Sequence, residues 1–315
     1  MRIVRSIDSY EAGADLLLSI GVFDGVHIGH RTVLSRLQAL RKPGTIVGAL
    51  TFEHHPQEFL HPDQAPKCLT TLDEKINLLA GCGLDVLFLL PFDERIQSVT
   101  AEKFLNNILL QRLHTRALIV GDQWRFGKGR EGDIELARTV LEAHACAFEA
   151  APLLERDAER VSSSRIRSLI NEMRFEQADA LLGSAYQVRG NVTLGDGRGH
   201  ELGYPTANLA IAPEKLIPPA GVFATTAHHS GKTYPSVTSI GDKPTFGGGK
   251  LTLETYLPGF DKSIYGDQLA LTGWRFLRKQ ERFAGREALI KQIALDVKAS
   301  LSAPDEGQDI VRTNR

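Results

Sequence analysis

Short apolar runs alternate with amphipathic segments along the first half of the chain. The runs TIVGALTF (45–52), LDVLFLLPF (84–92) and RALIVG (116–121) have the length and composition of buried strands. Segments such as RTVLSRLQAL (31–40) and IELARTVLEAHA (134–145) place apolar residues at helical spacing. Strands that alternate with helices predict a doubly wound α/β domain, whose parallel sheet is covered on both faces.

The pattern changes at about residue 184, where short β-rich stretches separated by glycine and proline begin. Such spacing favours an antiparallel barrel or sandwich; the family resemblance described below implies the barrel. The stretches are YQVRGNVT (186–193), GVFATTAHH (221–229), PSVTSIG (235–241), LTLETYL (251–257) and DQLALTGWRFL (267–277).

The end of the chain adds one helix to the barrel. Leu289, Ile293 and Val297 recur at helical spacing within residues 286–301, so this segment should present one apolar stripe to the barrel. The chain has 315 residues, enough for two separate cores. The predicted domains are residues 1–183 and 184–302, followed by a polar tail at 303–315.

Composition excludes several classes of protein. The formal net charge is -1, without the basic excess of a nucleic-acid binder. Cys68, Cys82 and Cys146 form no CxxC pair, so neither a disulfide framework nor structural zinc is expected. The apolar run LLLSIGVF (16–23) is too short to span a bilayer. We therefore expect a cytoplasmic protein with small-molecule partners and no nucleic-acid or membrane partner; a weak homo-oligomer remains open.

The decamer GVFDGVHIGH (21–30) connects a predicted strand to a predicted helix. Ligands of open α/β sheets bind beyond the carboxyl ends of the strands, where this connection lies. Gly25 and Gly29 permit close backbone approach, and the following helix N-terminus favours anions. His27 and His30 can donate hydrogen bonds to phosphate oxygens. The decamer thus favours a triphosphate site, the alternative being two histidines that only cap a helix.

The decamer resembles the HxGH signature of the nucleotidyltransferase superfamily, which class I aminoacyl-tRNA synthetases share. More residues are needed to choose a family, and ordered matches follow in both halves. With them the chain resembles the bacterial bifunctional riboflavin kinase/FMN adenylyltransferases, or FAD synthetases, over nearly its whole length. The matching segments are FEHHP (52–56), VGDQWRFGKGREGD (120–133), VSSSRIR (161–167), GDGRGHELGYPTANL (195–209), SIGDKPTFGG (239–248), ETYL (254–257) and FDKSIYGD (260–267).

In the first half the resemblance implies an ATP site for adenylyl transfer. SSSRIR (162–167) places hydroxyls and two arginines where a loop enters a helix, which suits phosphates whose charge grows as pyrophosphate departs. The alternative is a serine-rich helix cap with solvated arginines. By resemblance, the catalytic residues are His27, His30 and Arg167, and the ATP-binding residues are Gly21, Phe23, Asp24, Gly25, Gly29, Ser163, Ser164 and Arg165.

The same half should bind the flavin. DQWRFGKGR (122–130) follows a predicted strand, so its polar residues lie at the carboxyl edge of the sheet beside two planar aromatic side chains. Core packing is the alternative for the aromatics, and turn chemistry is the alternative for the histidine of FEHHP (52–56). The flavin-binding residues implied by the resemblance are His55, Asp122, Trp124, Phe126 and Arg130.

The second half contains the parts that phosphoryl transfer needs. Thr206 offers a hydroxyl ligand for Mg²⁺, and Asn208 is a polar group that orients ligands. Strand alternation puts Glu254 on the face opposite Leu253 and Thr255; the resemblance makes it the general base, and an acid on a solvated face is the alternative. The implied residues are Gly197, Gly199 and Thr206 for ATP, Thr206 and Asn208 for the metal, Asn208 for the flavin and Glu254 for catalysis.

The resemblance implies two ATP-dependent reactions, one in each domain. The barrel would convert riboflavin and ATP to FMN and ADP with Mg²⁺, and the α/β domain would convert FMN and ATP to FAD and pyrophosphate. His54, Gln123 and Tyr256 depart from the family's pattern. One alternative is an FMN adenylyltransferase whose barrel only binds flavin, and another is a flavin sensor without catalysis.

Overall fold

A computed structural model describes residues 1–152, 154–156, 159–195, 199, 202–242 and 251–302 of the chain. Its contacts divide the chain into two units, Met1–Arg165 and Ile166–Arg315. The division falls inside helix α7 (Ser163–Asn171), eighteen residues before the predicted boundary at 183/184. That boundary stays a prediction.

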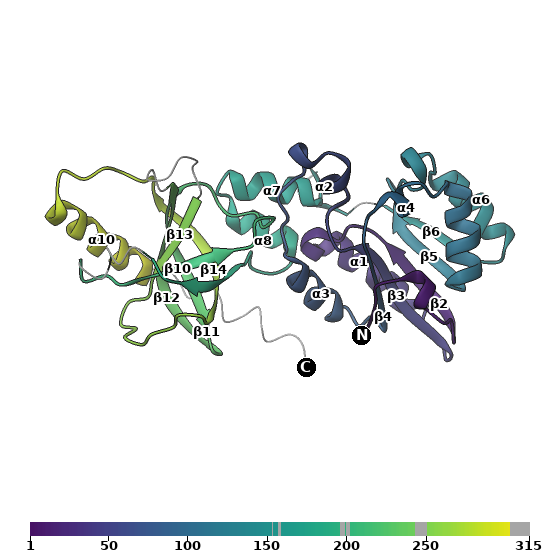
Figure 1. Ribbon diagram of the computed structural model, residues 1–315, viewed down its shortest axis with the longest axis horizontal. Coiled ribbons are helices and arrows are strands. Elements are labelled where there is room, and N and C mark those ends of the chain that lie inside the picture. Colours follow the sequence, from purple (N-terminus) through teal and green to yellow (C-terminus); the bar gives the residue numbers. More distant parts are fainter. Residues whose placement is uncertain (153, 157–158, 196–198, 200–201, 243–250, 303–315) are drawn as a thin grey trace. The chain divides into compact units, whose positions relative to one another are not determined.

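Six parallel strands form the sheet of the first unit, in the order β1-β4-β3-β2-β5-β6 (Figure 1). Leu18 of the central strand lies opposite Gly48 on one side and Leu118 on the other. The chain adds strands first on one side of β2 and then on the other, which creates a ligand-binding crevice at the carboxyl ends. The strands are β1 (Arg2–Val4), β2 (Asp15–Ile20), β3 (Thr45–Phe52), β4 (Val86–Leu90), β5 (Thr115–Gly121) and β6 (Ala147–Ala151).

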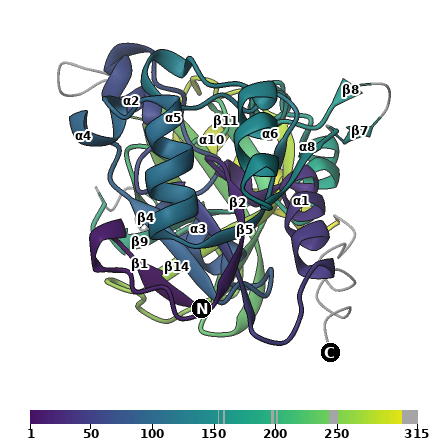
Figure 2. The ribbon, with the colours of Figure 1, turned by 90° about the vertical axis from the view of Figure 1, so that its right-hand side faces the viewer.

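Helices cover both faces of this sheet (Figure 1, Figure 2). Leu37 and Leu79, from α1 (Ile28–Ala39) and α3 (Leu72–Ala80), pack with Val47 on one face. Leu109 and Leu141, from η4 (Phe104–Arg112) and α6 (Ile134–Ala143), belong to the core on the other face. The predicted doubly wound α/β architecture is confirmed. Shorter elements of this unit are η1 (Ile7–Ser9), η2 (Asp24–Val26), α2 (Pro56–Leu60), η3 (Pro62–Gln64), α4 (Glu94–Gln97), α5 (Ala101–Lys103), η5 (Lys128–Arg130), β7 (Glu155–Arg156) and β8 (Glu159–Arg160).

Element η4 is a π-helix rather than an ordinary α-helix. The Leu113 N–H donates to the Ile108 carbonyl oxygen, five residues back, at 2.9 Å. π-helical turns are rare and frequently occur at functional sites. Here η4 begins with Phe104, whose ring packs against those of Trp124 and Phe126.

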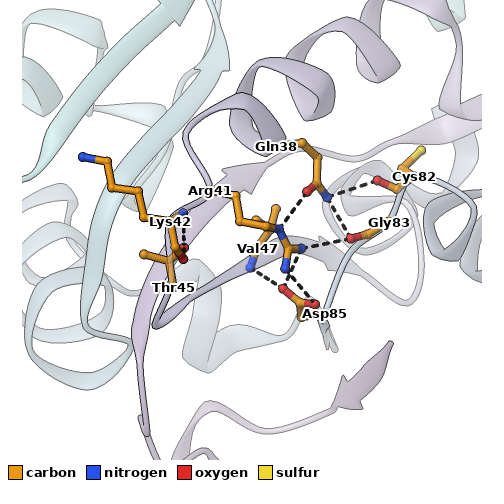
Figure 3. Close-up of polar contacts among 8 residues, drawn as sticks. All are labelled: Gln38, Arg41, Lys42, Thr45, Val47, Cys82, Gly83 and Asp85. Carbon is orange, nitrogen blue, oxygen red and sulfur yellow. Dashed lines mark hydrogen bonds and ion pairs between the residues drawn. The ribbon is translucent and has the colours of Figure 1, made fainter.

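A polar network joins α1 to the amino ends of β3 and β4 (Figure 3). The Asp85 carboxylate accepts a hydrogen bond from the Val47 N–H at 2.8 Å and pairs with the Arg41 guanidinium at 2.8 Å. Gln38 donates to the carbonyl oxygens of Cys82 and Gly83. This network lies at the edge of the sheet opposite the predicted ligand sites.

The second unit contains a closed antiparallel barrel, as predicted, with strand order β10-β13-β12-β11-β14-β9. Its interior holds a chain of buried hydroxyls: Thr225 Oγ1 lies 2.7 Å from both Ser236 Oγ and Thr238 Oγ1, and Thr238 lies 2.9 Å from Thr255. These buried hydroxyls therefore satisfy one another's hydrogen bonds inside the barrel. The strands are β9 (Val188–Thr193), β10 (Thr206–Ile211), β11 (Gly221–His229), β12 (Lys232–Asp242), β13 (Leu251–Tyr256) and β14 (Gln268–Arg278).

Two further helices pack on the barrel. From α8 (Phe175–Leu182), the buried Phe175 ring contacts Phe223 and Trp274. Helix α10 (Arg286–Leu301) packs on β11 and β12. The carboxylate of its Asp296 accepts two hydrogen bonds from the Arg278 guanidinium, one on each oxygen. The predicted terminal helix is confirmed. Within the part of the chain that the structure describes, none of the helices has the length and apolar content needed to cross a membrane.

Candidate functional site

The loop from Gly21 to His30 lies at the carboxyl end of β2 and leads into α1, as the sequence predicts. Phe23 and Val26 adopt the left-handed region, at φ 52° and 40°, beside Gly25 at φ 79°. A β-branched residue in this region is strained. Such strain persists where the surroundings hold the backbone in place, and it clusters at ligand sites.

Several side chains hold this loop. The buried Asp24 carboxylate accepts hydrogen bonds from the Leu69 N–H at 2.8 Å and the Thr70 N–H at 3.2 Å. Thr51 donates to the Val22 carbonyl oxygen at 3.0 Å, and Arg31 Nε donates to that of Val26 at 3.0 Å. Asp24 therefore anchors the loop with its carboxylate, which the sequence assigned to ATP.

His27 has a structural task as well as its predicted catalytic one. Its Nδ1 accepts the His30 N–H at 3.3 Å and so caps α1. An Nδ1 that accepts leaves the proton of the neutral ring on Nε2. A Cβ at Gly29 would stand 3.2 Å from two ring atoms of His27, so the glycine leaves room for that ring.

The two imidazoles form a stacked, buried pair. Their centroids are 3.6 Å apart at an interplanar angle of 17°. Burial lowers the pKa of His27 to about 4 and the pKa of His30 well below its ordinary value, so both rings are neutral at pH 7. Among the residues that the structure describes, His30 Nδ1 finds no hydrogen-bond partner. An unpaired buried nitrogen costs about 1–3 kcal/mol, a cost typical of functional sites.

The serine and arginine motif meets the histidine loop at Ser163. Its hydroxyl donates to the Asp24 carbonyl oxygen at 2.9 Å, while Ser162 caps α7 by accepting the Arg165 N–H at 3.2 Å. Arg165 contacts the Glu159 carboxylate at 2.6 Å and donates to the Arg156 carbonyl oxygen. Its guanidinium therefore contacts both short strands, β7 (Glu155–Arg156) and β8 (Glu159–Arg160).

For the other two predicted residues of this motif, Ser164 and Arg167, the structure gives burial and position on α7. Ser164 is exposed on α7, next to Ser163. Arg167 is half-buried on the same helix and falls in the second unit. Their predicted roles toward ATP stay predictions.

The predicted flavin residues follow β3 and β5, the neighbours of β2, so they share its carboxyl edge. His55 caps α2 through Nδ1, which accepts the Gln57 N–H at 3.2 Å, as the turn-chemistry alternative expects. The Trp124 and Phe126 rings stack at 4.1 Å, and Phe126 belongs to the buried core. The other two predicted contacts, Asp122 and Arg130, are exposed.

The predicted kinase residues share the outer face of the barrel. Asn208 lies directly opposite Glu254, and Glu254 lies directly opposite Ser239 on the next strand. Thr206 Oγ1 donates to Glu254 Oε2 at 3.3 Å. Leu253 and Thr255 are buried in the interior, so the predicted alternation is confirmed and Glu254 points outward.

Glycines bring backbone close to these side chains. A Cβ at Gly199 would stand 3.1 Å from Thr206 Oγ1, and one at Gly195 would stand 2.0 Å from Asn208 Nδ2. A Cβ at Gly199 would also stand 2.5 Å from the Tyr204 carbonyl oxygen, so glycine is needed there, whereas at Gly195 the Asn208 side chain would have to move. Gly197, predicted for ATP, lies outside the described residues.

A cavity of about 450 Å³ opens on the same outer face. Ser239, the neighbour of Glu254, lines it together with Val222, Arg278, Phe283 and Leu289. The Arg278 guanidinium lies 5.5 Å from the centroid of the Phe283 ring. A volume of this size is typical of small-molecule sites, which combine apolar walls with a few polar groups.

Comparisons with known proteins match both units. A family model described as FAD synthetase matches residues 10–165, and one described as riboflavin kinase matches residues 182–303. The bifunctional riboflavin kinase/FMN adenylyltransferase of Escherichia coli K12 is 34% identical over 300 residues, covering 94% of this chain and 96% of that protein. The chain belongs to the bifunctional riboflavin kinase/FMN adenylyltransferase family.

Other members of the bifunctional riboflavin kinase/FMN adenylyltransferase family are similarly close. The Bacillus subtilis 168 protein is 32% identical over 291 residues, covering 91% of this chain and 92% of that protein. The crystal structure of a macrolide-efflux protein from Streptococcus pneumoniae has a TM-score of 0.86 at 25% identity, covering 96% of this chain and 98% of that one. The structural likeness supports the fold.

Sequence motifs missed several residues that contact or neighbour the predicted site residues. Thr51 and Thr70 hold the histidine loop but lie in a strand and a loop with no recognised motif. Lys75 is buried although it lies on a helix that reads as amphipathic. Ser239 lies in the matching segment SIGDKPTFGG (239–248), but no role was predicted for this residue. Strand alternation, the pattern that puts Glu254 on the outer face of its strand, also puts Ser239 on the outer face of the neighbouring strand. This alternation could have identified Ser239 from the sequence.

Proposed function

We propose that this chain makes FMN from riboflavin and ATP, and FAD from FMN and ATP. The observation that carries the proposal is that each unit groups most of its own predicted residues; Arg167, on α7 in the second unit, is the exception. The stacked histidines stand at the carboxyl edge of the sheet. Thr206, Asn208 and Glu254 stand together on the barrel. Family membership supports both activities, rather than adenylyl transfer alone.

In adenylyl transfer, a phosphate oxygen of FMN attacks the α-phosphorus of ATP, and the bond from this phosphorus to the bridging oxygen of pyrophosphate breaks. Charge grows on the phosphate oxygens as this happens. His27 Nε2–H is a preorganised donor in a buried site, where such a donor is worth more than in water. The cap bond at Nδ1 keeps the proton on Nε2, because an accepting Nδ1 cannot carry it.

In riboflavin phosphorylation, the 5′-hydroxyl oxygen attacks the γ-phosphorus of ATP, and ADP leaves. Glu254 takes the hydroxyl proton. Thr206 holds one oxygen of this carboxylate by a hydrogen bond, which fixes its direction. The neighbouring cavity is the proposed site of the flavin ring, with Asn208 on the opposite side of Glu254.

The barrel residues also fit Mg²⁺. Thr206, Asn208 and Glu254 offer hydroxyl, amide and carboxylate oxygens, the ligands that Mg²⁺ prefers. Across the described ranges, no group of three or more His, Cys, Asp or Glu side chains could hold a metal by itself. Thr206 and Asn208 would therefore hold the ion together with the nucleotide phosphates, and the ion would neutralise phosphate charge.

The proposed partners are riboflavin, FMN and ATP. A balanced charge gives no reason to add a nucleic acid. The three cysteines are thiols rather than disulfide partners, which supports the reducing environment of the cytoplasm as the compartment.

The experiment that tests this function uses purified protein with riboflavin, ATP and Mg²⁺, followed by chromatographic separation of flavins. FMN should appear first and FAD later. Formation of FAD from supplied FMN without any FMN from riboflavin would favour the adenylyltransferase whose barrel only binds flavin. Flavin binding without either product would favour a sensor.

A further inference from the structure

Lys75 is a buried lysine in the first turn of α3. Its side chain is 7% exposed, and its Nζ donates a 2.6 Å hydrogen bond to the Phe52 carbonyl oxygen. Lysine is almost never fully buried unless it has partners. No predicted motif contains this residue, and neither proposed reaction uses it.

Two carboxylates act electrostatically on the Lys75 ammonium. Burial lowers the pKa of Lys75, while the carboxylates of Asp24 and Glu58 and the Cys68 side chain oppose that shift. Asp24 is itself buried in η2, where it accepts hydrogen bonds from the Leu69 and Thr70 N–H groups of the loop before α3. Lys75 therefore supplies positive charge beside a buried carboxylate that would otherwise destabilise the loop.

The contacts of Lys75 connect the supports of two substrate segments. Phe52 ends β3 and leads directly into the predicted flavin segment at His55. Asp24 belongs to the predicted ATP loop and accepts hydrogen bonds from Leu69 and Thr70, which lead into α3. One ammonium thus braces both the strand before the flavin segment and the helix that receives the ATP loop.

We propose that Lys75 is a positioning residue for adenylyl transfer, which sets the placement of the flavin segment relative to the histidine loop. This inference rests on the proposed sites of FMN and ATP in the first unit. Transfer needs the FMN phosphate oxygen in line with the α-phosphorus, and a displacement of about 1 Å can lower a rate by about 100-fold.

The test measures FAD formation from FMN by the full chain carrying Lys75→Met, with Lys42→Met as the matched control. Lys42 is an exposed lysine of the same unit, near the amino end of β3. Lys75→Met should lower kcat by about 10- to 100-fold and leave the KM for ATP within about twofold. Lys42→Met should match the wild type. Riboflavin phosphorylation by the same preparation should be unchanged.

Lys75→Arg keeps a cation and hydrogen-bond donors, so it should recover part of the lost kcat. If Lys75→Met fails to fold, Lys75→Arg decides: the inference requires a kcat reduced by about threefold or more, with the thermal unfolding midpoint unchanged. Wild-type FAD formation by either folded variant would overturn the inference. So would an equal loss of both activities, because Lys75 would then support the whole chain.

His27→Ala, assayed alongside, separates this inference from the proposed site. It should lower FAD formation by about 10²- to 10³-fold, as for other preorganised donors. If His27→Ala is without effect, the proposed phosphate site is wrong. If His27→Ala is impaired but Lys75→Met is normal, only the role of Lys75 is overturned.

Discussion

Glu254 is the residue whose proposed role can be tested most directly. Glu254→Gln keeps the shape of the side chain but removes the base, so riboflavin phosphorylation should fall by about 10²- to 10⁴-fold in kcat. Binding of riboflavin and ATP should change little. Steady-state kinetics give kcat, and adenylyl transfer from FMN reports that the chain is folded. Near-normal FMN production would leave the carboxylate with an orienting role only.

Thr206→Ala should fail in a different way from Glu254→Gln. It removes a proposed metal ligand and one hydrogen bond to Glu254 Oε2, while the base remains. We therefore expect a higher Mg²⁺ concentration for half-maximal phosphorylation. Titrating Mg²⁺ at saturating ATP measures this, and an unchanged titration would remove Thr206 from the metal site.

The buried His27 makes the stability of the first unit depend on pH. Its folded pKa of about 4 lies below the unfolded value, so the unfolded chain binds the extra proton. The stabilisation is complete above about pH 6.5 and is lost as pH falls through about 4, by on the order of 1–3 kcal/mol. His27→Gln should flatten this decline.

Urea unfolding followed by Trp124 fluorescence, in a Trp274→Phe background, measures that dependence. The wild type and His27→Gln should differ in slope between pH 4 and about 6.5, where the two His27 pKa values lie. Equal slopes would mean that His27 does not titrate as its burial requires. His30 is buried as well, so it contributes a decline of its own in both proteins.

The predictability of single residues follows from how local their interactions are. His27 and His30 could be placed because the glycines, the strand before them and the helix after them are contiguous in sequence. The anchoring role of Asp24 could not, because its partners Leu69 and Thr70 are some 45 residues away. Hydrogen bonds between residues far apart in the sequence produce no pattern of polar and apolar positions from which they could be predicted.

At the scale of elements, the network at the amino edge should affect stability without affecting catalysis (Figure 3). Asp85→Ala leaves the Val47 N–H without its acceptor and should lower the free energy of unfolding by about 1–3 kcal/mol. Arg41→Ala breaks a half-exposed ion pair and should lower it by about 1 kcal/mol or less.

Denaturant unfolding measures both variants, and FAD formation serves as the control. The kcat and KM of adenylyl transfer should stay at wild-type values at 25 °C, since the network is at the opposite edge from the histidine loop. A raised KM for FMN in Asp85→Ala would contradict this separation. If Arg41→Ala lowered the free energy of unfolding more than Asp85→Ala does, the predicted order of the two variants would be wrong.

Helices and strands were predicted best where a long hydrophobic pattern fitted only one type of secondary structure. The central strands and the flanking helices follow from buried runs and helical spacing. Strand β1 is only three residues long and pairs at the edge with β4, so its pattern was too short to read. Segment 101–113 has helical spacing in the sequence, but the π-helical winding of residues 104–112 depends on packing that periodicity does not report.

For the whole molecule, the two activities should be separable, and the helix α8 decides where. Phe175 packs on Phe223 and Trp274, and the Tyr186 N–H donates to Asp179 at 2.7 Å. A fragment that starts at residue 172 keeps these contacts, whereas one that starts at 184 loses them. Removing the buried Phe175 ring alone should lower the free energy of unfolding of the barrel by about 3–5 kcal/mol.

We expect the fragment 172–315 to phosphorylate riboflavin and the fragment 184–315 to be less stable and less active. The fragment 1–183 should adenylylate supplied FMN. Thermal unfolding and the two product assays measure this. A folded, ATP-binding fragment 1–183 that makes no FAD at any Mg²⁺ concentration would overturn the assignment of one reaction to each unit.

The outward direction of Glu254 has a consequence for directed evolution of the kinase. Along β13, positions such as Leu253 and Thr255 meet only other protein atoms, whereas Glu254 and its outer neighbours meet substrate in the proposed site. A library that randomises interior positions would therefore search for thermostable variants while leaving flavin selectivity alone. A library at Ser239 and the residues that line the cavity would do the reverse, so the two properties can be improved in separate rounds and then combined.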